Sequence, residues 1–138
     1  MKDDTPVIRT KRVYDPPAPG DGRRFLVERL WPRGIKKEAL AADAWMKDVA
    51  PSTELRRWFD HQVERWEGFE RRYREELDAN PGAWAPLLEA CERGAVTLLY
   101  SAHDTAHNSA LVLRDYLAER RTARRAGRRA ERGHDVPR

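Results

Sequence analysis

The stretch Ala95–Tyr100, with the sequence AVTLLY, decides the fold of this chain. Its unbroken apolar character is typical of a central strand in a parallel sheet, because helices cover such a strand on both faces. Weaker patterns predict further strands at Val7–Tyr14, Arg24–Trp31 and, for a short one, Ala42–Met46. Three prolines and two glycines at positions 15–22 mark a surface loop between the first two of these.

Helical patterns fill the intervals between the predicted strands. Ser52 is a good N-cap for a helix that carries Leu55, Trp58 and Phe59 on one face. Further helices are expected at Lys36–Leu40 (a short turn), at Val63–Ala79, from about Ala83 to a stop at Gly94, and after a cap at Asp104 or Thr105. The start near Ala83 follows because Pro86 is tolerated only in a first turn.

Helices between strands require crossover connections, so the sequence predicts an α/β fold. The 138 residues suffice for one small domain with an ordinary core. We expect a mostly parallel sheet of three to five strands flanked by helices.

Composition excludes several classes of protein. A single cysteine, Cys91, rules out an internal disulfide framework and a multi-cysteine zinc site. Phosphate-binding and dinucleotide-binding glycine motifs and a Cys-x5-Arg phosphatase loop are all absent from the sequence. His103 and His107 would share a face only on a continuous helix, so neither a metal nor a cofactor is predicted. No apolar run is long enough for a membrane span, and we expect a cytoplasmic protein.

The positive charge is concentrated at the C-terminus. Residues 120–138 hold eight arginines and two acids, although the whole chain carries a net charge of only +4. We therefore divide the chain into a domain at 1–119 and an arginine-rich tail at 120–138. The tail supports an alternative function, nucleic-acid contact through Arg121, Arg124, Arg125 and Arg128. The simpler interpretation is a solvated, arginine-rich end with no dedicated partner.

Two arginines mark the expected carboxyl end of strand 24–31. Arg29 lies near that end beside Glu28, and Arg33 follows four residues later in a loop. Guanidinium groups at a sheet edge can bind a carboxylate or phosphate through bidentate hydrogen bonds. The alternative is that Glu28 and Arg29 pair with other side chains and only fix the loop.

A second cluster follows strand 95–100. A strand, a short loop and a helix N-terminus form an arrangement that favours anions in α/β proteins. We therefore predict a small anionic ligand at the carboxyl edge, in the site of either an enzyme or a binding protein without catalytic activity. The predicted ligand contacts are Arg29, Trp31, Arg33, His61, Tyr100, Thr105 and Asn108, and the catalytic candidates are Ser101 and His107. His61 has a simpler interpretation as a cation at a helix end.

Several segments together resemble one family. They are Lys11–Asp15, Arg29–Gly34, Ala50–Ser52 with Leu55-Arg56 and Trp58-Phe59, and Leu98–Tyr100 with Asp104 and His107-Asn108. This pattern is similar to the DUF488, YeaO-like family over residues 7–117. The resemblance implies a small bacterial cytoplasmic α/β domain without an established activity. In a longer branch of that family, the segment after the last strand is similar to cysteine-bearing sequences. This chain has Ser101 and His107 in the equivalent segment, so the resemblance implies no thiol chemistry there.

Overall fold

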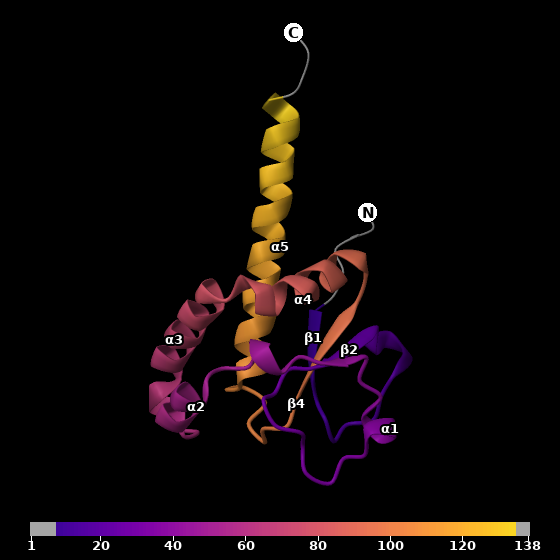
Figure 1. Cartoon of the computed structure of the whole chain (residues 1–138), viewed down its shortest axis with the longest axis vertical. Helices are drawn as coiled ribbons and strands as arrows, with labels where there is room; N and C mark the ends of the chain where they lie inside the picture. Colours follow the sequence, from indigo (N-terminus) through magenta and orange to yellow (C-terminus); the bar gives the residue numbers. More distant parts are fainter. Residues whose placement is uncertain (1–7, 135–138) are drawn as a thin grey trace.

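The computed structural model describes residues 8–134, with side chains through residue 127. Four strands form one sheet in the order β1–β4–β2–β3, and every pairing is parallel (Figure 1). The strands are β1 (Ile8–Arg12), β2 (Arg23–Leu26), β3 (Ala44–Trp45) and β4 (Val96–Tyr100). The predicted α/β fold with a parallel sheet flanked by helices is confirmed.

β4 is the central strand, as its composition predicts. All five of its residues are buried, and it pairs with β1 on one side and β2 on the other. Leu98 belongs to the large core, whereas Leu99 belongs to a smaller core on the opposite face. Thr97 is the polar member, and its hydroxyl is satisfied by donating to the Asp21 carbonyl oxygen at 2.7 Å.

Helices cover the two faces of the sheet unequally. The large core is built from α2 (Thr53–Phe59), α3 (Trp66–Ala79), α4 (Pro81–Arg93) and α5 (Ser109–His134), whereas α1 (Lys37–Leu40) contributes Leu40 to the smaller one. Short 3-10 turns lie at Pro19–Asp21, Lys47–Val49 and Val63–Arg65. Figure 1 shows α4 crossing α5, which projects well beyond the rest of the molecule.

β2 is shorter than the predicted strand at 24–31. The register pairs Leu26 with Leu99, and the amide of Val27 makes the next bond, to the Leu99 carbonyl oxygen. Since β4 ends at Tyr100, Glu28 has no strand beside it to pair with. Glu28 and Arg29 therefore lie just past the strand rather than within it. At the N-terminal end, β1 begins at Ile8, and Val7 lies outside the described residues.

Two helix starts differ from prediction. α4 begins at Pro81, so Pro86 lies inside the helix; Pro81 itself takes the favourable first-turn position. α5 begins at Ser109 because Asn108, not Asp104 or Thr105, is its cap: the Asn108 Oδ1 accepts from the amide of Leu111 at 3.1 Å.

Smaller differences concern single positions. Ala106, which falls within the helix predicted after Asp104 or Thr105, is exposed in the loop before α5. Val63 is 53% exposed, because it lies in a 3-10 turn before α3 rather than on the helix stripe. The Ser52 cap of α2 is confirmed, since its side chain accepts from the amide of Leu55. α5 runs without a break through residues 119 and 120.

Candidate functional site

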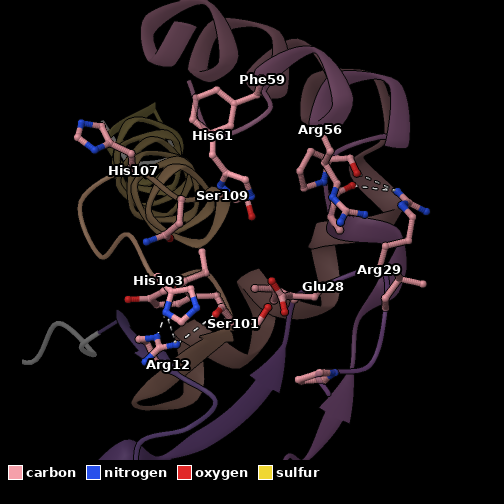
Figure 2. A pocket seen from close by; sticks show the side chains of 18 of the residues that line it. Arg12, Glu28, Arg29, Arg56, Phe59, His61, Ser101, His103, His107 and Ser109 are labelled. Carbon is pink, nitrogen blue, oxygen red and sulfur yellow. Dashed lines mark hydrogen bonds between the residues drawn. The ribbon is translucent and has the colours of Figure 1, made fainter. Parts of the chain in front are cut away.

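A pocket of about 700 Å³ opens where the carboxyl ends of β1, β2 and β4 meet. The α2 region and the start of α5 complete its walls (Figure 2). The predicted site residues that line it are Arg29, Trp31, Arg33, His61, Tyr100, Ser101, His107 and Asn108. Thr105 is not among them, because it is exposed in the loop before α5. Two clusters about 70 residues apart in sequence thus meet around one hollow, as parallel strands that end at one edge allow.

The pocket also includes residues that the sequence analysis missed. They are chiefly Arg12, Tyr14, Arg56, Phe59 and His103. Arg12 is the last residue of β1. Because parallel strands end at the same edge of a sheet, its position could have been predicted in the same way as that of the other two clusters. Arg56 comes from α2, and its sequence signal was its place in the Leu55-Arg56 segment of the family resemblance, which did not mark it as a ligand contact.

The lining is strongly basic. It contains Arg12, Arg29, Arg33 and Arg56 against one carboxylate, Glu28. None of these four guanidinium groups forms an ion pair with a carboxylate among the described residues. The buried arginine elsewhere in the sheet, Arg24, behaves differently: it lies 2.5 Å from Asp21. Guanidinium groups without a carboxylate beside them are available for an anion from outside the chain.

Arg12 ties β1 to the loop that follows β4. Its Nε donates to the Ala102 carbonyl oxygen at 3.0 Å, and its Nη2 lies 3.4 Å from the Ser101 carbonyl oxygen and 3.5 Å from the His103 Nδ1. The guanidinium also lies over the ring of Tyr14, 5.0 Å from its centroid. The two carbonyl acceptors are neutral, and no carboxylate of the described residues pairs with Arg12, so its positive charge is not cancelled.

The guanidinium group of Arg29 donates hydrogen bonds to backbone carbonyl oxygens of the chain. Its Nη2 donates to the Ala50 carbonyl oxygen at 3.0 Å and to that of Pro51 at 3.5 Å. The residue also borders a smaller hollow of about 310 Å³ that includes Asp48 and Asn80. Arg29 therefore acts as a strap between the end of β2 and the segment before α2, with carbonyls in place of the carboxylate partners considered from sequence.

Arg33 and Arg56 hold no partner. Neither side chain makes a hydrogen bond or ion pair with any part of the chain that the structure describes, and both are exposed. Figure 2 shows Arg56 reaching from α2 toward the hollow, on the side opposite Arg12. They are the freest cations of the lining.

His107 is paired with an acid at the rim. Its Nδ1 lies 3.0 Å from the Asp104 Oδ2, and its ring meets Trp66 edge to face at 5.2 Å. The pKa of Asp104 lies below its usual value because its carboxylate accepts hydrogen bonds from the amide of Ala106 and from His107. The hydroxyl of Ser101 makes no hydrogen bond to His107 within residues 8–127, so the structure does not join them as nucleophile and base.

His61 enters the pocket on an unusual backbone. Asp60 ends α2 with φ of 45°, and His61 follows with φ of 55°. Two successive non-glycine residues in the left-handed region are uncommon, and such conformations gather at functional sites.

The cysteine lies elsewhere. Cys91 is buried in α4 and does not line the pocket, and burial raises the pKa of its thiol to about 11. A thiol protonated at neutral pH and away from the hollow offers no nucleophile there.

The tail arginines are partly engaged with the body. Arg120 lies 2.6 Å from Asp78, Arg124 lies 3.8 Å from Glu92, and Arg121 is only 5% exposed. Arg125 is half-buried, and the side chain of Arg128 lies outside the described residues.

These features define a small α/β domain with a parallel sheet and an arginine-lined pocket at its carboxyl edge. The chain belongs to the DUF488 family: residues 7–134 match the DUF488-N3i family, described as the inactive DUF488-N3 subclade.

Its relatives include the uncharacterized protein YeaO of Escherichia coli, 48% identical over 80% of this chain and 96% of the relative. The uncharacterized proteins Rv3073c of Mycobacterium tuberculosis and Mb3100c of Mycobacterium bovis are 44% identical over 80% of this chain and 92% of each relative. No solved structure matches the chain. No helix within residues 8–134 is long and apolar enough to cross a membrane.

Proposed function

We propose that the protein binds a small anion bearing a phosphate or carboxylate group in this pocket. One observation carries the proposal: four arginines line the hollow, and no carboxylate of the described residues pairs with any of them. Arg12 and Arg29 are half-buried, and a half-buried charge normally has a charged partner, because removing it from water is costly. An anionic ligand would supply the missing counter-charge.

Arg33 and Arg56 are the primary anion ligands in this proposal, since their donors are free. Arg12 adds charge while it holds the loop after β4 in place. Arg29 positions the wall at Ala50 and Pro51. Each charge-assisted hydrogen bond contributes about 1.5–3 kcal/mol, so the loss of a single one should weaken anion binding measurably.

The proposal concerns binding. The description of the family as inactive fits such a role, and so does the lack of a hydrogen bond between Ser101 and His107. The catalytic roles of these two residues remain predictions. Nucleic-acid contact through the tail has less support, because Arg121 is buried and Arg124 faces Glu92.

The proposal also includes the cellular location of the protein. The named relatives come from bacteria, and an unpaired cysteine is usual in a reducing compartment. Both points support a bacterial cytoplasmic protein.

Calorimetric titration of the full chain with inorganic phosphate and with citrate tests the proposal. Arg56→Ala should weaken binding by about tenfold or more, the value of one charged hydrogen bond. Its neighbour Arg57 is the matched control, because it is also exposed on α2 but does not line the pocket. Equal effects of Arg56→Ala and Arg57→Ala, or no binding of either anion by the unmodified protein, would contradict the proposal.

A further inference from the structure

Glu28 is the one carboxylate in the lining of the pocket. It is half-buried, and its side chain makes no hydrogen bond or ion pair with the described residues. Four guanidinium groups line the same hollow, yet none of them lies within 4.0 Å of the Glu28 oxygens. A carboxylate that lines the same pocket as four arginines and pairs with none of them is available to a hydrogen-bond donor of a bound ligand.

The position of Glu28 is fixed by its neighbours rather than by its own side chain. The Trp45 Nε1 donates to the Glu28 carbonyl oxygen at 2.6 Å, and the amide of Val27 donates to the Leu99 carbonyl oxygen at 3.2 Å. Arg29 is anchored on Ala50. The backbone on both sides is therefore held, and Figure 2 shows the Glu28 side chain at the sheet side of the hollow, with Arg56 across from it. A side chain presented from a fixed backbone is suited to recognition.

A bare anion would satisfy the arginines and leave Glu28 repelled and unpaired. An ionised carboxylate can only accept hydrogen bonds, so its complement is a donor on the ligand. A neutral hydroxyl suits this pocket better than an ammonium group, because four arginines against one glutamate leave the lining positive. A volume of about 700 Å³ also has room for a ligand far larger than inorganic phosphate.

An acidic residue at the end of a strand accepts ribose hydroxyls in other parallel α/β sheets, which shows that this chemistry works at such an edge. Resting on the proposed function, we propose that Glu28 is a specificity residue. It selects anions that also carry hydroxyl groups, of the sugar-phosphate or hydroxy-acid class, over bare anions of the same charge.

Two pairs of probes test this inference and separate phosphate from carboxylate ligands. Inorganic phosphate is compared with ribose 5-phosphate, and succinate with malate, by calorimetry on the full chain. The unmodified protein should bind the hydroxylated member of at least one pair about tenfold more tightly, as expected for a hydrogen bond to a charged acceptor. Glu28→Ala should reduce that preference to about twofold or less, and should leave the affinity for the bare anion unchanged or raised.

Glu28→Gln keeps the size of the side chain and removes its charge, so it should retain part of the preference while binding the bare anion more tightly. Glu54→Gln is the control, since Glu54 is an exposed carboxylate of α2 outside the pocket. Circular dichroism and thermal melting establish that each variant is folded.

The outcomes separate the two proposals. If the anions bind in a manner that depends on Arg56, but Glu28→Ala does not change the preference within either pair, the inference on Glu28 is wrong and the proposed function stands. If neither citrate nor any of the four probes binds to the unmodified protein, both fail.

Discussion

Glu76 of α3 accepts two hydrogen bonds from Ser52, one from its amide at 2.9 Å and one from its hydroxyl at 2.5 Å. The same hydroxyl oxygen accepts from the amide of Leu55 at 3.1 Å, so the cap of α2 is itself held by the next helix. This pairing fixes where α2 begins and, through it, where Arg56 stands above the pocket. The position of Arg56 in the proposed anion site therefore depends on a carboxylate that does not line the pocket.

Glu76→Ala should lower the free energy of unfolding by about 2 kcal/mol, because it removes two charge-assisted hydrogen bonds from a half-buried cap. It should also weaken anion binding, since Arg56 loses its fixed position. Urea denaturation measures the first effect and calorimetry the second. Glu75→Ala is the control: Glu75 is exposed, and its replacement should change stability by less than about 0.5 kcal/mol. Equal stability of the two variants would contradict this role of Glu76.

Arg29 and Arg33 should respond in opposite ways to replacement by lysine. Arg29→Lys loses the donor geometry that reaches the Ala50 and Pro51 carbonyl oxygens and should cost about 1–2 kcal/mol of stability. Arg33→Lys should leave stability within about 0.5 kcal/mol, because the Arg33 side chain bonds to none of the described residues. It should nevertheless weaken anion binding, since an ammonium group cannot form a two-pronged contact.

Urea denaturation and phosphate titration of the two variants check this contrast. A stable Arg29→Lys variant that no longer binds anions would make Arg29 the anion ligand and would contradict its role as a strap.

The meeting of the two predicted clusters could be foreseen because one strong rule governs it. The apolar run of β4 predicts a central parallel strand, and parallel strands end at a common edge, so Arg33 and Tyr100 had to approach each other. The same rule applies to Arg12, because it lies at the end of a strand that was also predicted. Arg12 was nevertheless not among the predicted site residues.

Other features depend on tertiary structure that no local pattern reveals. Arg56 and Arg57 are adjacent exposed arginines on one helix, and only the docking of α2 on α3 through Glu76 decides which of them borders the pocket. Asp104 and Asn108 are both good helix caps. Asp104 instead closes a turn by accepting from the amides of Ala106 and His107, which leaves Asn108 to begin α5.

Asp21 should make the stability of the protein sensitive to acid. It is 2% exposed and lies 2.5 Å from Arg24 and 2.9 Å from Lys11. Burial alone would raise the pKa of this carboxyl, but the hydrogen bonds from Lys11, the Ala18 amide and Arg24 outweigh burial and hold the pKa below its usual value. The folded state therefore favours the ionised form. This stabilisation is present above the unfolded pKa of about 3.9 and is lost as the pH falls through the lower folded value.

Asp21→Asn should cost roughly 3 kcal/mol at pH 7, because it leaves Arg24 buried without a counter-charge. The difference from the unmodified protein should narrow as the pH falls below about 4, where the carboxyl of the unfolded chain takes up a proton, and should be smallest below the lower folded pKa, where the native carboxyl is also neutral. Urea denaturation at pH 7 and near pH 3 measures both values. Asp15→Asn, an exposed carboxylate without a bonded partner, serves as the control. A difference that stays constant with pH would show that the charge of Asp21 does not stabilise the fold.

Gly22, directly before β2, and Gly34, in the loop after it, together test backbone crowding at the entry to β2. Both adopt positive φ, 65° and 73°, so alanine is strained at either position. They differ in surroundings: a Cβ at Gly22 would lie 2.2 Å from the Ala95 carbonyl oxygen, whereas a Cβ at Gly34 meets nothing within 4 Å. That carbonyl also accepts from the amide of Arg23 at 3.0 Å, so it cannot retreat without breaking the start of the strand pairing. Gly34→Ala should therefore cost about 1 kcal/mol, and Gly22→Ala about 3 kcal/mol or more. Chemical denaturation of the two variants measures the difference, and similar costs at both positions would mean that β2 and β4 are not packed as closely as this contact requires.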